Sequence, residues 1–289
     1  MINLKYPILE PGLYIVSVPI GCLSDLTFRA LHVLKSTENI FAEDTRNANA
    51  LLSSLQIDRS KKSISSYHEH SSERERKKVI QLIESGESVS LICDAGTPLI
   101  SDPGFKLTRE IIDAGFQVFT VPGVSSPIAA LTVSGLPTDT FSFLGFLPVS
   151  KNKKVKLLIR YRDLKSSLII FESGKRIDKT LGLIEEVYSP STEMCICREL
   201  TKKYEEIKRF KIRDIKATLE SLLSFKGEFV IIVGKDVEPT LDLENLDKKI
   251  KQYKKKNNLK TTVALLVDEM NISKKLVYQR ALEIFESRD

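Results

Sequence analysis

The feature that most constrains this chain is a regular alternation between short apolar, β-branched runs and longer amphipathic segments. The first such runs lie at 13–18, 39–43, 62–67, 88–93 and 117–121. Each has the length of a strand, and the segments between them space their apolar residues as helices do. Strands that alternate with helices favour a mostly parallel sheet covered on both faces, so residues 1–125 are predicted to form an α/β domain.

A second series of runs predicts another α/β domain over residues 126–236. These runs lie at 141–146, 167–173, 193–200, 204–210 and 227–234. Charged and apolar residues alternate in the run at 204–210, which is typical of an antiparallel strand at a sheet edge. Beyond a break at 236–247, residues 245–289 are predicted to form a small helical module, with Ser273 as an N-cap. The module is similar to a helix-turn-helix, and a helical hairpin that caps the body is the alternative.

Composition favours a protein of a reducing cytoplasm. The 44 basic and 38 acidic residues give a net charge of +6, which permits a polyanionic partner without proving one. Four cysteines in 289 residues are too few for a disulfide framework. The first residues lack the apolar core of a signal peptide, and no run approaches the roughly 18 apolar residues of a membrane span. No membrane partner is therefore expected.

The glycines exclude several classes of enzyme. The chain contains no GxGxxG, GxxxxGKS, GxxxxGKT or GxSxG sequence, which argues against a dinucleotide-binding fold, a P-loop and a serine hydrolase. Instead, loops rich in glycine and proline follow predicted strands at 18–27, 93–104 and 121–127. Ser24 or Asp25 is expected to cap the helix after the first of them. Because loops that follow parallel strands gather at one sheet edge, they predict a ligand crevice there.

Several motifs follow one another along the chain in a fixed order. They are PIGCLSDLT (19–27), AEDTR (42–46), DAGTPLISDPG (94–104), FLGFLP (143–148), the Glu-Ser pair at 172–173, RELTKKYEE (198–206) and GEFV (227–230). In this combination the chain resembles the tetrapyrrole-methylase superfamily and, within it, the ribosomal small-subunit methyltransferase I family. The resemblance spans about residues 12–235. It departs from the family pattern at Cys22, where asparagine is usual, and at Val124, where proline is usual.

The resemblance implies a fold and an activity. The expected fold is two α/β domains of tetrapyrrole-methylase type with the cofactor in the interdomain cleft, plus a small helical C-terminal module, assembled as a homodimer. The expected activity is S-adenosylmethionine-dependent 2′-O-methylation of a cytidine in the decoding region of 16S rRNA, cytidine 1402 in the family, within the small ribosomal subunit. Two alternatives stay open: a small-molecule, tetrapyrrole-type methyltransferase, and a non-enzymatic RNA-binding or ribosome-assembly factor.

The loops and the resemblance together indicate a cofactor site. Its expected residues are Pro19, Asp94, Ala95, Gly96, Ile100, Ser101, Asp102, Ser125, Ser126, Glu172, Arg198, Gly227 and Glu228. An ionised Asp94 would accept a hydrogen bond from a cofactor hydroxyl or ammonium, and capping the next helix is its alternative role. Ser125 and Ser126 precede a helix N-terminus, which suits a carboxylate. For Arg198 the alternative is a buried ion pair with a glutamate.

The implied methyl transfer is an in-line displacement for which positioning supplies most of the acceleration and no metal is required. A general base would help to remove the hydroxyl proton. The candidates for the catalytic residues are Asp44, Glu172 and Lys202. For Asp44 the alternative is an N-cap. Zinc binding by His68, His70, Cys195 and Cys197 is disfavoured because no CxxC spacing occurs.

Basic residues outside the cofactor loops indicate an RNA footprint. The expected contacts are Arg46, His68, His70, Lys151, Lys153, Lys154, Lys202, Lys254, Lys255 and Lys256. The histidine rings suit contact with an unstacked base. The basic runs at 150–165 and 248–260 suit a phosphate backbone, and an ordinary solvated face is the alternative for each run.

Overall fold

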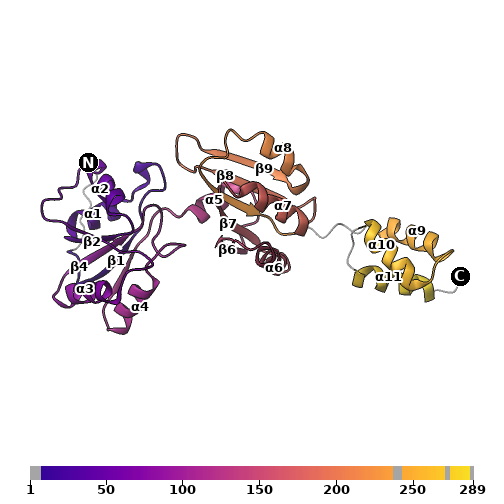
Figure 1. Cartoon of the computed structure of the whole chain (residues 1–289), viewed down its shortest axis with the longest axis horizontal. Coiled ribbons are helices and arrows are strands. Elements are labelled where there is room, and N and C mark those ends of the chain that lie inside the picture. The colour runs from indigo at the N-terminus through magenta and orange to yellow at the C-terminus, as the bar shows by residue number, and fades with distance from the viewer. Residues whose placement is uncertain (1–7, 237–242, 271–273, 287–289) are drawn as a thin grey trace.

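The computed structural model describes residues 8–236, 243–270 and 274–286. Two α/β units and a helical module follow one another along the longest axis of the molecule (Figure 1). The expected N-cap at Ser273 lies outside the described residues. Of the helices that the structure describes, none is both long enough and apolar enough to span a bilayer.

The first unit contains a five-stranded parallel sheet with the strand order β3-β2-β4-β1-β5. Its strands are β1 (Gly12–Val16), β2 (Asn39–Ala42), β3 (Ser63–Ser66), β4 (Ser88–Ile92) and β5 (Val118–Val121). Each coincides with a run for which the sequence predicted a strand, and β1 begins one residue before its run, at Gly12. Because the strands are parallel, their carboxyl ends share one edge, and the loops that follow β1, β2 and β4 all leave from it.

Helices cover both faces of this sheet, as the strand and helix alternation predicted. They are α1 (Phe28–Ser36), α2 (Thr45–Ser54), α3 (Glu73–Glu84) and α4 (Phe105–Asp113). Buried side chains of α1 and α2, such as Val33 and Leu52, pack with Tyr14 and Ile40 on one face. On the other face, buried residues of α3 and α4 pack with the neighbouring strand positions, including Phe41. The period-two alternation of the strands divides the apolar residues between these two cores.

The first helix begins two or three residues later than the predicted caps require. Its N-cap is Thr27, whose side chain accepts a hydrogen bond from the Ala30 backbone N–H at 3.1 Å. The prediction that Ser24 or Asp25 caps this helix is wrong, because both residues lie in a short 3-10 turn, Leu23–Asp25, that precedes it. The turn lengthens the loop that follows β1.

The second unit contains a mixed five-stranded sheet with the order β6-β7-β10-β8-β9. Its strands are β6 (Phe141–Phe146), β7 (Ser167–Ser173), β8 (Glu193–Arg198), β9 (Glu206–Lys211) and β10 (Glu228–Val233). Strands β6 and β7 are parallel, and the remaining pairs are antiparallel. The prediction of an antiparallel edge strand within 204–210 is confirmed by β9, which pairs with β8.

Helices also cover both faces of the second sheet. They are α5 (Ser126–Ser134), α6 (Lys151–Arg162), α7 (Ile177–Val187) and α8 (Ile215–Glu220). Although α5 follows a strand of the first sheet, its Ala130 and Leu131 pack against Cys195 and Ile232 of the second. The other helices cover the opposite face, where Leu158 and Ile184 join the largest core cluster. The chain therefore passes from one unit to the other between β5 and α5.

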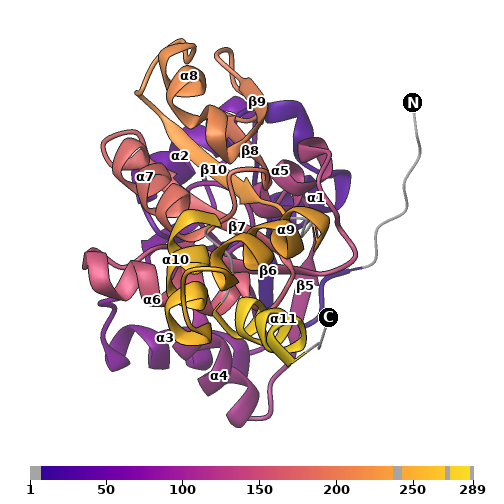
Figure 2. The same ribbon diagram turned by 90° about the vertical axis from the view of Figure 1, so that its right-hand side faces the viewer.

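The helical module has its own core. It consists of α9 (Leu243–Lys254), α10 (Leu259–Met270) and α11 (Lys274–Glu286), which pack against one another (Figure 2). The buried residues of its core are Leu246, Ile250, Val263, Leu266, Val277, Ala281 and Ile284. Arg280 of α11 donates two hydrogen bonds to Asp247 of α9, at 2.8 and 2.7 Å. The basic stretch at 248–260 thus forms most of α9 and the beginning of α10.

Candidate active site

A cavity of about 430 Å³ lies where the carboxyl edge of the first sheet faces the second unit. This volume is in the range of small-molecule sites. Most of the residues predicted to bind a cofactor line it: Asp94, Ala95, Gly96, Ile100, Ser101, Asp102, Ser125, Ser126, Glu172, Gly227 and Glu228. Pro19 and Arg198 are not among the lining residues. The three glycine- and proline-rich loops and the second unit therefore enclose a single space.

Hydrogen bonds join the three loops of the first unit to one another. Val18 and Gly96 form an isolated β-bridge, with N–O distances of 2.8 and 3.0 Å. The Thr97 hydroxyl donates to the Val124 carbonyl at 2.9 Å and lies 2.9 Å from the Ser17 hydroxyl. Thr97 therefore connects β1, the loop at 93–104 and the loop at 121–127, which fixes one wall of the cavity.

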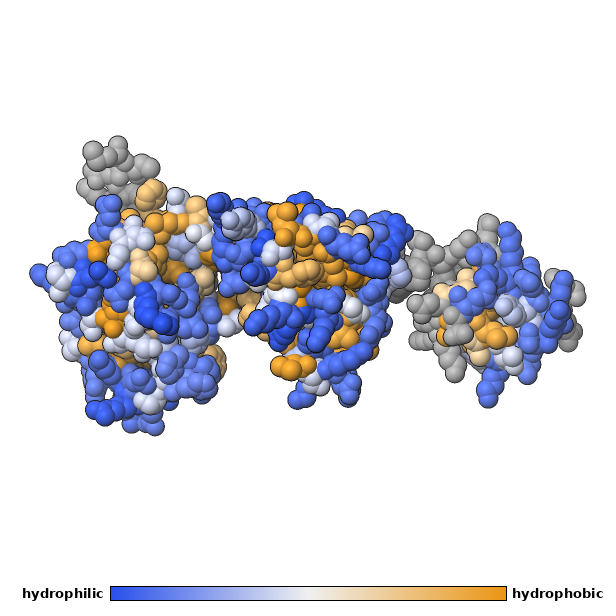
Figure 3. Space-filling model, turned by 45° about the horizontal axis from the view of Figure 1, so that its top comes forward, coloured by the Kyte–Doolittle hydropathy of each residue, from blue (hydrophilic) through white to orange (hydrophobic). Residues whose placement is uncertain are grey.

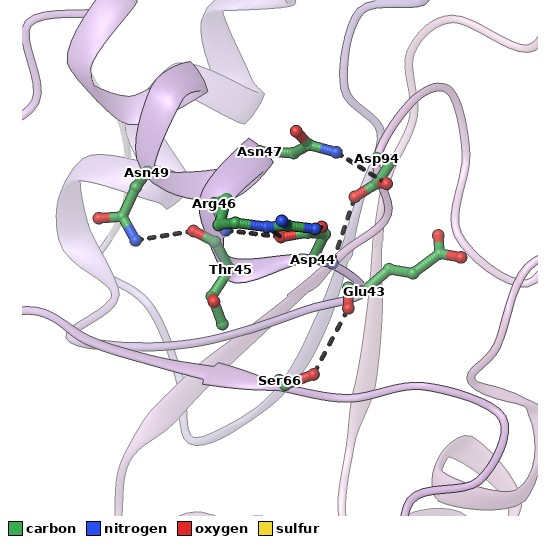
Figure 4. A network of polar contacts seen from close by, with 8 residues as sticks. All are labelled: Glu43, Asp44, Thr45, Arg46, Asn47, Asn49, Ser66 and Asp94. Carbon is green, nitrogen blue, oxygen red and sulfur yellow. Dashed lines mark hydrogen bonds and ion pairs between the residues drawn. The ribbon is translucent and has the colours of Figure 1, made fainter.

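Glu43, Asp94 and Asp102 form an acidic wall on the first-unit side of the cavity. Figure 4 shows two of them, Glu43 and Asp94, with their neighbours. The Asp94 carboxylate accepts hydrogen bonds from the Asp44 backbone N–H at 3.2 Å and from the Asn47 amide at 2.9 Å. Burial, reinforced by the charge of Asp94, raises the pKa of Glu43. Burial and the charges of Glu43 and Asp94 raise the pKa of Asp102 to about 6. A cationic ligand would relieve this repulsion.

The alternative role considered for Asp94, capping the next helix, is wrong. That helix is α4, and its N-cap is Gly104. Asp94 instead contacts the beginning of α2, at the end of the neighbouring strand β2. The contact fixes the start of α2 beside the cavity.

Asp44 is the N-cap of α2, which confirms the alternative role that the sequence offered for this residue. Its carboxylate accepts from the Arg46 backbone N–H at 2.8 Å and from the Arg46 guanidinium at 2.6 Å. These hydrogen bonds lower the pKa of Asp44 to about 2. A carboxylate with so low a pKa is a weak proton acceptor, and Asp44 does not line the cavity. The geometry gives no support to Asp44 as a general base.

Glu172 lines the cavity, but its carboxylate is fully buried and already bonded. It accepts from Arg176 Nε at 2.6 Å, from Thr180 Oγ1 at 2.7 Å and from the Ser173 backbone N–H at 2.9 Å. Lys154 Nζ lies 3.9 Å from its Oε2. The assignment of Glu172 as a proton acceptor is therefore corrected, because these donors occupy both of its oxygens.

Lys154 requires the matching correction. Its side chain is only 7% exposed, and Nζ donates to the Thr180 hydroxyl at 3.1 Å. An ammonium group enclosed in this way does not reach a phosphate, so Lys154 is not an RNA contact. Lys154 lies one helical turn from buried Leu158, so both residues belong to the face of α6 that packs into the core. The basic composition of residues 150–165 gave no sign of this buried face.

Arg198 is also a structural residue. Its guanidinium donates to the Lys226 and Tyr204 carbonyls at 2.8 and 3.2 Å. It lies 3.7 Å from Glu206, and both side chains of this pair are 7% exposed. The alternative of a buried ion pair is therefore correct, and the expectation that Arg198 contacts the cofactor is not, because its donors point into the second unit.

Lys202 lines the cavity and lies between two glutamates. Its Nζ is 3.1 Å from Glu199 Oε1 and 2.9 Å from Glu228 Oε2. Burial alone would lower the pKa of Lys202, but the hydrogen bonds to Glu228 and Glu199 outweigh burial and raise it. Lys202 therefore carries a positive charge near neutral pH and cannot accept a proton there.

The two units also touch directly beside the cavity. The Cys22 backbone N–H donates to Thr201 Oγ1 at 3.0 Å. A Cβ atom added at Gly21 would lie 2.5 Å from Lys202 Cγ and 2.7 Å from Thr201 Oγ1, so only glycine permits this approach. Across the cavity, a Cβ atom at Gly145 would lie 2.8 Å from Ser101 Oγ. Close contacts on both sides hold the second unit over the site.

Three of the expected RNA contacts lie at the exposed end of the first sheet. Arg46 is 89% exposed in its side chain and follows β2. His68 and His70 follow β3 and are exposed, with ring centroids 6.3 Å apart. Cys195 and Cys197, the other residues of the disfavoured zinc site, are buried in β8 of the second unit. Among the described residues, no group of three or more metal-binding side chains lies together.

Of the other expected RNA contacts, Lys202 lies in the cavity, and the rest lie on α6 and on the helical module. Lys151 and Lys153 are exposed on α6. Lys255 and Lys256 are exposed in the turn that follows α9. Lys254 is half-buried, and its ammonium donates to the Ile284 carbonyl at 2.7 Å, so it joins α9 to α11.

Comparison with solved structures confirms the expected fold. The methyltransferase CobJ aligns with a TM-score of 0.59 and 16% identity, over 78% of this chain and 94% of that one. A uroporphyrin-III-C-methyltransferase from Thermus thermophilus aligns with a TM-score of 0.52 and 20% identity, over 78% and 94% of the two chains. The model of the tetrapyrrole (corrin/porphyrin) methylases matches residues 12–216. The chain belongs to this family.

Sequence relatives narrow the assignment within the tetrapyrrole methylases. A protein from Rickettsia prowazekii, "Ribosomal RNA small subunit methyltransferase I", is 42% identical over 274 residues, which cover 94% of this chain and 96% of that protein. A protein of the same name from Pasteurella multocida is 35% identical over 94% and 97% of the two chains. The chain is thus a member of the ribosomal RNA small subunit methyltransferase I group, and the predicted resemblance is confirmed.

Sequence reasoning missed part of the lining of this cavity. The additional lining residues include Ile20, Glu43, Thr97, Phe146, Phe171 and Leu200. Phe146 and Phe171 lie 5.5 Å apart, centroid to centroid, and give the second-unit side of the cavity an aromatic surface. Phe146 belongs to the FLGFLP motif, and Glu43 to the AEDTR motif. The motifs therefore contained a signal for both residues, although spacing alone did not show which side chain faces the cavity.

Proposed function

We propose that this protein is an S-adenosylmethionine-dependent rRNA methyltransferase that modifies the 2′-hydroxyl of a cytidine in the decoding region of 16S rRNA. The observation that carries the proposal is the cavity, whose acidic wall faces an aromatic wall in a chain of this methyltransferase group. S-adenosylmethionine has the matching parts: an ammonium and a sulfonium that suit carboxylates, and an adenine that suits aromatic rings. The site needs no pyrophosphate-binding glycines for such a ligand.

The residues present fit this cofactor part by part. Asp94 and Asp102 provide carboxylates for its cationic groups or ribose hydroxyls. Ser125 and Ser126 lie at the beginning of α5, where free backbone N–H groups and the helix dipole favour a carboxylate. Phe171 offers a flat apolar surface for the adenine. When bound, the cofactor supplies an activated methyl group, so the protein is required mainly to hold the acceptor oxygen in line with it.

The surface around the cavity is consistent with an RNA substrate. Arg46, His68 and His70 are exposed at the same sheet edge as the acidic wall. Their guanidinium and rings suit a phosphate and an unstacked base. The exposed lysines of α6 and of the module extend the positive surface. We propose that together they bind the small ribosomal subunit in the cytoplasm.

We also propose that two copies of the chain form a homodimer. Apolar residues gather on the face of the second unit that Figure 3 shows. The exposed apolar residues of this unit include Ile128 and Val133 of α5. Burial of such residues against a second copy would stabilise a dimer.

The proposed function is tested by incubating purified small subunits with methyl-labelled S-adenosylmethionine and mapping the labelled nucleotide. Label on a 2′-hydroxyl of one cytidine in the decoding region is the expected result. Asp94→Ala is expected to weaken cofactor binding by roughly 1–3 kcal/mol, or about 5- to 150-fold, through loss of a charged hydrogen bond. Label on a base, or transfer to a porphyrinoid but not to RNA, would contradict the proposal. A protein that binds subunits but no cofactor would be a non-enzymatic assembly factor.

A further inference from the structure

Five acidic side chains line the cavity, and their hydrogen bonds show which of them could receive a proton. They are Glu43, Asp94, Asp102, Glu172 and Glu228. The Asp94 carboxylate accepts from Asp44 and Asn47. Glu172 is saturated by the donors described above, and Glu228 is paired with Lys202. Glu43 and Asp102 have neither a cation nor two donors on their carboxylates: Glu43 accepts from the Asp94 backbone, and Asp102 contacts the Cys93 thiol.

Glu43 and Asp102 occupy different places in the site. Asp102 belongs to the loop at 93–104, the loop assigned to the cofactor, and its carboxyl group is in contact with the buried Cys93 thiol. Glu43 directly follows β2, which lies between β3 and β4 in the sheet. The exit of β4 carries the cofactor loop, and the exit of β3 carries the exposed histidines. Glu43 therefore lies between the cofactor side and the proposed RNA side.

The close view shows how the chain separates Glu43 from its neighbour. The Asp44 carboxylate turns toward Arg46, whereas the Glu43 side chain extends past Asp94 in the other direction (Figure 4). The backbone carbonyl of Glu43 accepts from the Ser66 hydroxyl at 3.4 Å, which connects this turn to the end of β3. Successive residues diverge here because the strand ends at Ala42 and the helix cap begins at Asp44.

We propose that Glu43 is the catalytic base that takes the proton from the attacking ribose hydroxyl, an inference that rests on the proposed function. The oxygen–carbon bond to the methyl group forms as the sulfur–carbon bond breaks, and the electron pair of the broken bond stays on sulfur. The hydroxyl proton moves to the Glu43 carboxylate. The positive charge of the sulfonium and the negative charge of the carboxylate disappear together, so the step balances without another reactant.

The electrostatic surroundings of Glu43 suit this role. Burial raises the pKa of Glu43, and the charges of Asp94 and Asp44 raise it further. A hydrogen bond from the Asp94 backbone acts in the opposite direction. The charge of Glu43 in turn contributes to the raised pKa of Asp102, and Lys202 is the cation that lines the same cavity. A carboxylate whose pKa is moved toward neutral is a better proton acceptor than an ordinary glutamate.

The test compares Glu43→Gln with wild type and with Glu84→Gln, a matched control at an exposed position at the end of α3. Single-turnover methyl transfer to small subunits is expected to fall roughly 100- to 10,000-fold in Glu43→Gln and to stay unchanged in the control. Affinity for S-adenosylhomocysteine, measured by calorimetry, is expected to change less than threefold, on the order of 0.6 kcal/mol. The rate of wild type should rise with pH through an inflection that Glu43→Gln lacks.

A second readout does not depend on transfer. Carbon-13 labelling of the glutamate carboxyl groups, with Glu43→Gln used to assign the signal, should show that Glu43 titrates above the usual range for glutamate. The proposal is overturned if Glu43→Gln transfers methyl groups at the wild-type rate, if Asp102→Asn alone abolishes transfer, or if Glu43→Gln loses S-adenosylhomocysteine binding. If wild type itself methylates no RNA, the proposed function fails and Glu43 loses its role with it.

Discussion

Two of the three lysines at the beginning of α6, Lys151 and Lys154, allow a direct test of which charges this fold has buried. Lys151 pairs with Glu186 at 3.0 Å, and both side chains are more than half exposed. Lys154, one turn later, is 7% exposed, donates to Thr180 and lies near fully buried Glu172. Substituting each in turn separates a surface charge from a buried one on the same helix. We expect only the change at Lys154 to affect stability.

The magnitude follows from what each substitution removes. Lys154→Met keeps most of the apolar stem and removes a buried, charged hydrogen bond, which contributes about 1.5–3 kcal/mol. Lys154→Ala also removes about three methylenes at about 0.8 kcal/mol each. That loss is offset by about 1.5–2 kcal/mol of side-chain entropy that lysine no longer gives up on folding. The expected losses of unfolding free energy are therefore about 1.5–3 kcal/mol for Met and about 2–4 kcal/mol for Ala.

Urea unfolding measures these losses, with hydrogen exchange of β7 identifying the transition of the second unit. At a slope near 2 kcal/mol per molar urea, the midpoint should fall by roughly 1–2 M in Lys154→Ala. Lys151→Ala should leave the midpoint in place, because exposed ion pairs contribute little. A wild-type midpoint in Lys154→Met, or an equal loss in Lys151→Ala, would refute the reasoning that the ammonium of Lys154 is part of the core.

Three further predictions concern the contact between the units, the acidic wall and the module. Gly21→Ala should weaken S-adenosylmethionine binding several-fold in calorimetry, because its Cβ would collide with Thr201 and Lys202. The control variant Gly182→Ala should bind normally, because its Cβ would meet no neighbouring atom within 4 Å. Equal affinities of the two variants would contradict the inference that the contact at Gly21 holds the site together. The pKa of Asp102 is raised to about 6 and a cationic ligand favours the ionised form, so binding near pH 6 should release protons and strengthen as the pH rises. Calorimetry in two buffers of different ionisation enthalpy detects the release, and its absence would argue against cation binding at this wall. A chain ending at residue 236 should bind the cofactor normally. It should bind RNA more weakly and with a shallower salt dependence, because fewer counterions are released. An unchanged salt slope in filter binding would show that the module does not contact RNA.

The elements of the fold could be predicted from the sequence because they depend on local periodicity. Apolar alternation identified the strands of both sheets, and the charge pattern of 204–210 identified β9 as an antiparallel edge strand. The position of the cavity was also predictable. Parallel strands bring their carboxyl ends to one edge, so the loops at 18–27, 93–104 and 121–127 had to meet there. The motifs in these loops were sufficient to recognise the family.

The tertiary structure alone decided which charged residues are buried and which are available for chemistry. Lys154 looks like a surface lysine in its basic run, and only the packing of α6 beside α7 and β7 gives it Thr180 and Glu172 as partners. Arg198 meets Glu206 because β8 and β9 pair in a register that sets them opposite each other. Such partners are distant in sequence, and the free energy of burying a charge depends on them, not on the residue alone. For the same reason the AEDTR motif could be recognised in the sequence, but the sequence could not show whether Glu43 or Asp44 faces the cavity.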